Sequence, residues 1–258
     1  MGLYRREGAQ RVQEDLNLLK KRFSELAERA YARGRWYYSD FLSLGEQSAL
    51  GTLRLGEQVH TDGGYEAAER RIACFGSLPL CGCAAEPPIA CVCIRPVSAR
   101  FAEPLTHRDY LGSLMGLGLE REVLGDILVH DGCAWLFCLR RIAPFVTEQL
   151  VQVRRTPVGA SEGEPPALVL APPEPVEVVA ASERLDAVMA AVYRLSRAEA
   201  KALVESGLVF LDGLQAVSAA AELREGVLVS VRGHGRFRYE GPVRDTRRGR
   251  LRVCVRVY

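Results

Sequence analysis

The sequence has no hydrophobic run that approaches the roughly 18 residues needed to cross a membrane as a helix. Its first residues also lack the apolar stretch of a secretory signal and instead show a charged, helix-like pattern. We therefore expect a cytoplasmic protein with no membrane partner. In a reducing compartment the eight cysteines should be free thiols.

Signatures of cofactor and metal sites are also missing. The sequence has no Gly-x-Gly-x-x-Gly loop, which argues against a nucleotide-dependent methyltransferase. The Cys-x-Cys pairs at 81–83 and 91–93 are spaced more tightly than the Cys-x-x-Cys of most zinc sites. Cys91 and Cys93 instead suit alternate positions of one strand. The sequence predicts neither a cofactor nor a metal.

Lysine is scarce, because arginine makes up 31 of the 34 basic residues. Such a bias can follow from genomic base composition, so it is not itself evidence for RNA contact. The distribution of charge says more. The net charge is only +2, yet residues 182–258 hold 14 basic and 9 acidic side chains, and residues 232–258 hold 9 and 2. A basic segment at one end of a near-neutral chain predicts a polyanionic partner.

The first third of the chain has a helical pattern. Residues 5–33 repeat apolar side chains at intervals of three and four, which predicts a long helix, and the aromatic stretch 36–42 should join its core. Gly63-Gly64 precedes another helix-like stretch. Two such glycines can cradle a phosphate, although a plain turn is the simpler interpretation. We expect an N-terminal helical domain over residues 1–85.

The middle of the chain alternates strand-like and helix-like segments. Their order predicts β-α-β-β-α-β, the arrangement of ferredoxin-like and RNA-recognition (RRM) folds, at residues 89–95, 106–116, 125–130, 133–139, 142–153 and 167–170. Residues 156–176 hold six of the 13 prolines and predict a linker around the last strand. We expect this domain and its linker to occupy residues 86–176.

Residues 132–138 test the RNA-recognition interpretation. They match the signature of that fold at Gly132, Ala134 and Trp135, but cysteines take the two flanking aromatic positions. Stacking of bases on this strand is therefore not expected.

The segment that begins at Thr106 looks most like an active site. His107 and Asp109 invite a general-base interpretation, but residues two apart on a helix do not face each other. Thr106 and Asp109 instead fit a capping box, and His107 or Arg108 could meet a phosphate at the helix start. The sequence predicts no catalytic residue here.

Residues 182–232 are the most specific stretch of the sequence. They predict two helices, a helix stop and a tight hairpin turn, signalled in order by Leu185, Ser196 with Glu199, Gly207 and Asp212-Gly213. Arg197 and Lys201 are one helical turn apart and repel slightly, and Arg184 lies where a helix dipole disfavours a cation. A phosphate bound near these side chains would relieve both costs.

This ordered set resembles the S4 RNA-binding domain. The shared elements are Arg-Leu-Asp, Ser-Arg-x-x-Ala-x-x-Leu, a Gly, a strand followed by Asp-Gly, and Gly-x-x-x-x-Val. The resemblance implies a domain over residues 177–258 whose helices and hairpin pack on structured RNA. The residues implied at that surface are Arg184, Ser196, Arg197, Lys201, Asp212 and Gly213.

The basic C-terminal segment has features of its own. Arg232, Arg236 and Arg238 are interleaved with glycines and aromatic residues, which predicts phosphate pairing and base stacking beside the S4-like helices. Residues 250–258 alternate basic and apolar side chains, which predicts a strand with one apolar and one basic face.

Residues 63–71, 105–118 and 125–129, followed by an S4-like domain, resemble the bacterial YlmH family over nearly the whole chain. The resemblance implies an α+β protein with an N-terminal helical domain, an RRM-like middle domain and a C-terminal S4 domain, and it implies no catalysis. It further implies that the protein binds rRNA of the large ribosomal subunit. Its expected role is ribosome-associated quality control of stalled particles that still carry peptidyl-tRNA.

Two other functions stay open. An S4-containing RNA-modifying enzyme would place its active site in the N-terminal or middle domain. Arg184-Leu185-Asp186 is similar to the catalytic motif of pseudouridine synthases, but the glycine that precedes that motif is missing. The third possibility is an adaptor protein linked to cell division. The sequence indicates no oligomeric state.

Overall fold

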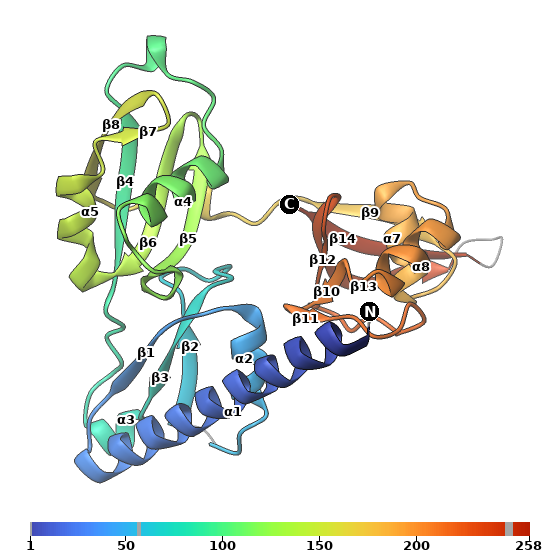
Figure 1. Ribbon diagram of the computed structural model, residues 1–258, viewed down its shortest axis with the longest axis horizontal. Coiled ribbons are helices and arrows are strands. Elements are labelled where there is room, and N and C mark those ends of the chain that lie inside the picture. Colours follow the sequence, from blue (N-terminus) through green and yellow to red (C-terminus); the bar gives the residue numbers. More distant parts are fainter. Residues whose placement is uncertain (1, 56–57, 246–249) are drawn as a thin grey trace. The chain divides into compact units, whose positions relative to one another are not determined.

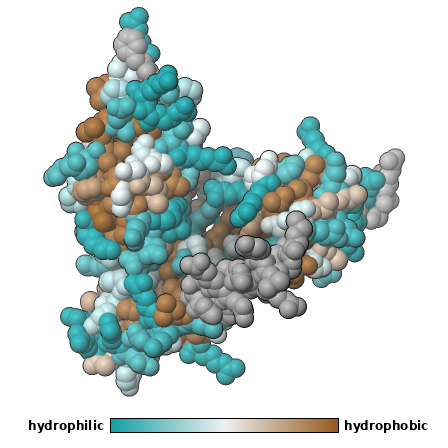
Figure 2. Space-filling model, viewed as in Figure 1, coloured by the Kyte–Doolittle hydropathy of each residue, from teal (hydrophilic) through white to brown (hydrophobic). Residues whose placement is uncertain are grey.

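The computed structural model describes residues 2–55, 58–245 and 250–258, and it divides into two compact units, Met1–Ala171 and Pro172–Tyr258 (Figure 1). Both units mix helices with antiparallel sheets. Every helix in the described part of the chain is too short or too polar to span a lipid bilayer. On the face drawn in Figure 2, hydrophobic areas lie among hydrophilic ones, as is ordinary for a folded surface.

The N-terminal part of the first unit is a long helix packed on a small sheet (Figure 1). Its elements are α1 (Gly2–Arg33), β1 (Tyr37–Leu42), α2 (Leu44–Gly51), β2 (Val59–Asp62), β3 (Arg71–Phe75) and α3 (Leu78–Cys81), and the sheet order is β1-β3-β2. The predicted long helix is confirmed. Its apolar side packs Phe23 and Ala30 against Leu42 and Phe75 of the sheet.

This three-stranded sheet corrects the prediction of a helical N-terminal domain, because the long helix packs on strands as well. The aromatic stretch that begins at Tyr37 favours a strand, because flat side chains pack well on a pleated surface. Its last two residues, Phe41 and Leu42, are buried, so the expectation that they form core is correct. The helix expected after Gly63-Gly64 does not form, since residues 63–70 follow a series of turns.

The carboxylate of Asp126 explains those turns. It accepts hydrogen bonds from the Tyr65 hydroxyl at 2.8 Å and from the backbone N–H groups of Glu69 and Arg70 at 2.7 and 3.1 Å. The Arg70 side chain in turn donates to backbone carbonyls on both sides of the junction, at Phe41, Arg121 and Leu124. These bonds join the N-terminal sheet to the middle of the unit.

The middle of the first unit has the element order strand, helix, strand, strand, helix, strand, strand, so a short extra strand precedes the last one of the predicted order. Its elements are β4 (Ile89–Pro96), α4 (His107–Gly116), β5 (Leu124–His130), β6 (Cys133–Leu139), α5 (Ala143–Gln149), β7 (Gln152–Val153) and β8 (Thr156–Glu162), with short 3-10 turns at Ala99–Phe101, Arg121–Val123 and Arg140–Ile142. The strands form one sheet in the order β5-β6-β4-β8-β7.

The last strand of this sheet is not the predicted one. Residues 167–170 form a short helix, α6 (Ala167–Leu170), and the strand is β8, inside the segment expected to be a linker. Thr156 and Val158 are buried at 2% and 4% exposure, while Pro157 and Gly159 between them face solvent. This alternation gives β8 a core-facing side, which outweighs the linker-like composition.

The two faces of this sheet are both covered. Helices α4 and α5 pack on one face, where Tyr110 and Val146 meet alternate residues of β4 and β6. On the other face Phe137 stacks on Tyr65 with ring centroids 4.9 Å apart and joins a cluster with Phe41 of the N-terminal sheet. Trp135 and Phe137 are 5% and 3% exposed, so neither aromatic ring of the RNA-recognition-like strand is available to a base.

The second unit packs two helices on one face of a six-stranded sheet (Figure 1). Its elements are β9 (Pro175–Ala180), α7 (Leu185–Tyr193), α8 (Arg197–Glu205), β10 (Val209–Leu211), β11 (Leu214–Gln215), β12 (Leu228–Val231), β13 (Gly235–Asp245) and β14 (Leu251–Val257). The sheet order is β11-β10-β12-β13-β14-β9. The predicted helices, their apolar stripe from Leu185 and the C-terminal strand are confirmed.

Candidate nucleic-acid interface

A buried carboxylate lies between the two helices of the second unit. Asp186, in the first turn of α7, has a side chain only 6% exposed. Its oxygens accept hydrogen bonds from Arg184 at 3.2 and 3.1 Å and from Arg197, the first residue of α8, at 2.6 Å. The two arginine side chains remain 43% and 46% exposed. One acid therefore holds two half-exposed guanidinium groups from either side of the helix junction.

This geometry weakens one argument for a bound phosphate near these cations. Asp186 already supplies a negative charge to Arg184 and Arg197. Burial alone would raise the pKa of Asp186, but the hydrogen bonds from Arg197 and Arg184 outweigh burial and hold that pKa below its usual value. Two arginines around one carboxylate still leave one net positive charge at this surface.

Lys201 and Ser196 also have partners within the protein. The Lys201 ammonium lies 3.5 Å from a carboxylate oxygen of Glu205, one turn along α8, and both side chains are more than half exposed. Such an exposed pair is weak and can exchange partners. Ser196 and Glu199 form the predicted capping box, with the Glu199 N–H donating to the serine hydroxyl at 3.2 Å. The serine hydroxyl therefore has a structural task at the start of α8.

The Asp212-Gly213 turn is the predicted hairpin between β10 and β11. Both residues have positive φ, 46° and 78°, as a type I′ turn requires. The Asp212 carboxylate accepts the Leu228 N–H at 2.9 Å, and the Asp212 N–H donates to the Leu228 carbonyl at 2.9 Å. Asp212 therefore ties the hairpin to β12.

The arginines of β13 do not lie beside the helices, which corrects the expected single surface. Phe237 and Tyr239 face the helices and are buried in the core, so Arg236 and Arg238, which alternate with them, lie on the opposite face of the sheet. Arg238 donates to the Gly226 carbonyl at 2.9 Å. Arg232 lies over the ring of Phe210, its guanidinium carbon 4.8 Å from the ring centroid.

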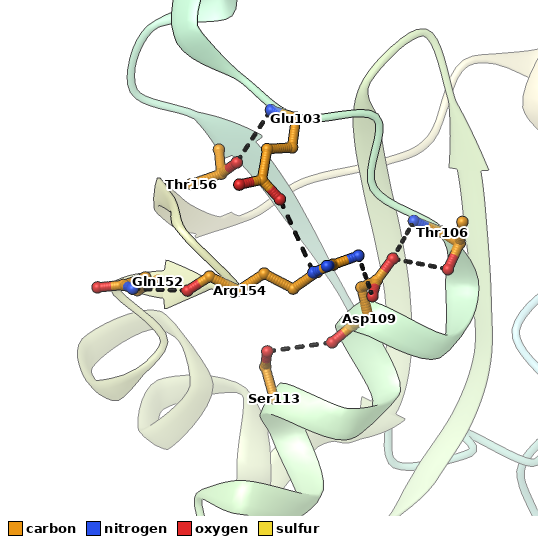
Figure 3. Close-up of polar contacts among 7 residues, drawn as sticks. All are labelled: Glu103, Thr106, Asp109, Ser113, Gln152, Arg154 and Thr156. Atoms are coloured by element: carbon orange, nitrogen blue, oxygen red, sulfur yellow. Dashed lines mark hydrogen bonds and ion pairs between the residues drawn. The ribbon is translucent and has the colours of Figure 1, made fainter.

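His107 and Arg108 lie elsewhere, at the exposed start of α4 in the first unit (Figure 3 shows the residues around it). The predicted capping box is present: the N–H and hydroxyl of Thr106 donate to Asp109 at 2.8 and 2.7 Å. These two bonds, and Arg154 nearby, hold the pKa of Asp109 below its usual value. The Asp109 carboxylate therefore caps the start of α4.

Arg154 was not predicted, because its partners are distant in sequence. It lies in the turn between β7 and β8 with a φ of 52°, and its guanidinium is 3.4 Å from Asp109 and 3.7 Å from Glu103 (Figure 3). Asp186 belongs to the Arg-Leu-Asp element of the S4 resemblance, but the sequence did not show that it also binds Arg197, 11 residues further on. Cys91 and Cys93 alternate on β4, as predicted, and the described residues contain no group of three or more His, Cys, Asp or Glu side chains suited to a metal.

Comparisons with known proteins show which family the chain resembles. Residues 92–164 match the family model described as "Putative RNA-binding domain in YlmH". The "Ribosome-associated protein quality control protein P2" of Bacillus subtilis (strain 168) is 31% identical over 210 residues, which are 78% of this chain and 79% of that protein. The solved structure "Cell division protein ylmH from Streptococcus pneumoniae" has a TM-score of 0.46 and 19% identity, covering 57% of this chain and 90% of that one.

The identity with the Bacillus protein extends over most of both chains, and the family model matches the middle sheet with its two helices. Both matches bear out the resemblance inferred from the sequence motifs. The chain therefore belongs to the YlmH family.

Proposed function

We propose that this protein binds structured RNA of the large ribosomal subunit, without catalysing a reaction, in the quality control of stalled complexes that carry peptidyl-tRNA. The observation that carries the proposal is the pair of half-exposed arginines, Arg184 and Arg197, fixed by the buried Asp186. Fixed guanidinium groups match the rigid phosphates of a folded RNA, because their fork geometry pairs two oxygens at once. Lys201, on the same helix as Arg197, adds a positive charge whose exposed ion pair with Glu205 can be replaced by a phosphate.

In this proposal the second unit acts as an S4 domain and the middle sheet of the first unit as an RRM-like domain. Residues 1–85, 86–176 and 177–258 would then be the three functional domains. Since the sheet face of the middle domain is covered, its RNA contact would come from His107 and Arg108 at the exposed start of α4. Two contacts on one chain raise the effective concentration of the second after the first has formed. Such a role belongs in the cytoplasm.

The name of the Bacillus relative supports the ribosomal part of the proposal, because it assigns that protein to ribosome-associated quality control. The local structure supports a binding role over catalysis at the most enzyme-like positions. Asp186 is hydrogen-bonded to two arginines and Asp109 to a helix start, so each carboxylate already has a structural role.

Co-sedimentation with 30S, 50S and 70S particles at low and moderate salt tests the proposal. Wild-type protein should be retained on 50S particles, and the double charge reversal Arg197→Glu with Lys201→Glu should abolish retention. A matched control is Arg224→Glu with Lys21→Glu, which changes the net charge equally at exposed positions outside the helix junction. For each phosphate contact that is lost, the slope of the logarithm of the binding constant against the logarithm of the salt concentration should become less steep by about 0.7–0.9.

Retention on no particle, or equal retention on every RNA, would overturn the ribosomal proposal. Equal loss in the reversal and in the control would show that only total charge matters. Mass analysis of rRNA from cells with and without the protein covers the enzyme alternative, because a modification that disappears with the protein would contradict a non-catalytic role.

A further inference from the structure

The face of the second unit's sheet that points away from α7 and α8 carries a row of cross-strand neighbours. Phe210 on β10 is opposite Ser230 on β12, and Ser230 is opposite Arg236 on β13. Tyr258, just after β14, donates its N–H to the Arg236 carbonyl at 3.0 Å. With neighbouring strands ~4.8 Å apart, the row from Phe210 to Tyr258 is about 14 Å long.

Both ends of this row are aromatic rings covered by arginine. The guanidinium carbon of Arg232 lies 4.8 Å from the ring centroid of Phe210, and that of Arg236 lies 5.3 Å from the centroid of Tyr258. Aromatic rings and guanidinium planes are the two kinds of side chain on which unpaired bases stack. The row therefore offers two stacking positions with positive charge at each.

Two acidic residues of the same face, Glu240 and Glu177, form ion pairs with arginines of β14. Glu240 lies 3.1 Å from Arg256, and Glu177 lies 3.0 Å from Arg252. The row itself contains no acid, and Arg238 follows next on the same side of β13. The charge of this surface is therefore complementary to a phosphate backbone.

We propose that the row of Phe210, Ser230, Arg236 and Tyr258, with Arg232, binds a short single-stranded segment of RNA. Unpaired bases would stack at its two ends, and phosphates would pair with the arginines. Base-paired RNA is not the expected ligand here, because its bases are already stacked on one another. The inference rests on the proposed function only in taking RNA as the ligand. It assigns unpaired nucleotides to the sheet face that points away from α7 and α8, and folded RNA to the face that carries these helices.

The test measures fluorescence anisotropy of the full chain with a labelled, unstructured RNA of about ten nucleotides. Tyr258→Ala should weaken binding about five- to tenfold without changing the salt slope, since it removes a ring but no charge. Tyr258→Phe keeps the ring and should bind within about twofold of wild type. Arg236→Gln should weaken binding and also flatten the salt slope, whereas Arg224→Gln, an exposed arginine outside the row, should have little effect.

Unchanged binding by Tyr258→Ala, or an equal loss with Arg224→Gln, would reduce the row to a general basic patch and overturn the inference. Failure of the wild-type protein to bind the oligonucleotide would overturn it as well. The helix-side variant Arg197→Glu with Lys201→Glu separates this inference from the proposed function. It should lose 50S retention while keeping most of its affinity for the oligonucleotide, because its changes lie on the other side of the sheet.

Discussion

The carboxylate of Asp186 and the guanidinium of Arg197 lie 2.6 Å apart, across the junction between α7 and α8. Arg184 donates two further hydrogen bonds to the same carboxylate. The two arginines therefore reach the surface with a fixed separation. A surface fixed before binding loses less side-chain entropy when a rigid partner docks.

Replacing Asp186 by Asn should lower the free energy of unfolding by about 1.5–3 kcal/mol, because hydrogen bonds to a charged group at a buried position are lost. Urea denaturation of the isolated protein measures this change. The control is Glu205→Gln, which breaks an exposed pair with Lys201 and should change stability by less than about 0.5 kcal/mol. Equal midpoints for the two variants would show that the Asp186 contacts contribute nothing to stability.

The same variant tests whether Asp186 positions Arg184 and Arg197 for binding or only offsets their positive charge. Asp186→Asn adds one positive charge to a surface proposed to bind RNA, so electrostatics alone predicts tighter binding. If Asp186 positions Arg184 and Arg197, the variant should instead bind 50S particles more weakly while its affinity for unstructured RNA is kept. Tighter binding to both would contradict a positioning role.

The stability contribution of Asp186 should also depend on pH. Its pKa is lowered in the folded state, so its contribution is complete above the usual carboxyl pKa of about 3.9 and is lost as the pH falls through the lower folded value. The stability difference between wild type and Asp186→Asn should therefore shrink as the pH is lowered from about 5 through the titration range of carboxyl groups. A difference that stays constant over this range would show that ionisation of Asp186 is irrelevant to folding.

The sequence predicted best those features that are local. The capping boxes of Thr106 with Asp109 and of Ser196 with Glu199 involve residues three apart. The Asp212-Gly213 turn depends on two adjacent residues. Such signals are complete within one helical turn or one hairpin. No knowledge of distant packing is needed to interpret them.

Features that depend on distant partners were missed. Arg154 and Asp109 are 45 residues apart. The helix expected after Gly63-Gly64 does not form, because the backbone there binds Asp126, more than 50 residues further on. Strand β8 was hidden by Pro157 and the linker-like composition around it, because its pairing with β4 and the burial of Val158 involve residues distant in sequence. The opposite facing of Arg236 had a signal that was overlooked, since Phe237 beside it must take the core side.

Asp126→Asn should destabilise the junction inside the first unit. One amide oxygen cannot replace the three hydrogen bonds that Asp126 accepts from Tyr65, Glu69 and Arg70, so a loss of about 1–3 kcal/mol is expected. Hydrogen exchange at the amides of residues 69 and 70 should accelerate as well. Asp131→Asn, the same change at an exposed turn of the β5–β6 hairpin, should leave both quantities near their wild-type values.

Replacement by alanine should have opposite effects on stability at Gly63 and at Gly112. A Cβ at Gly63 would clash with the Cβ of Ala68 and lie 2.6 Å from the Arg70 carbonyl oxygen, so Gly63→Ala must displace backbone of the junction. The expected loss is about 1–3 kcal/mol. Gly112 lies in α4 with no atom within 4 Å of an added Cβ, so Gly112→Ala should stabilise the protein by about 0.5–1 kcal/mol through helix propensity. Thermal unfolding of both variants checks the pair. A Gly63→Ala variant as stable as wild type would mean that residues 63–70 can move apart, and that the Asp126 bonds do not fix these turns.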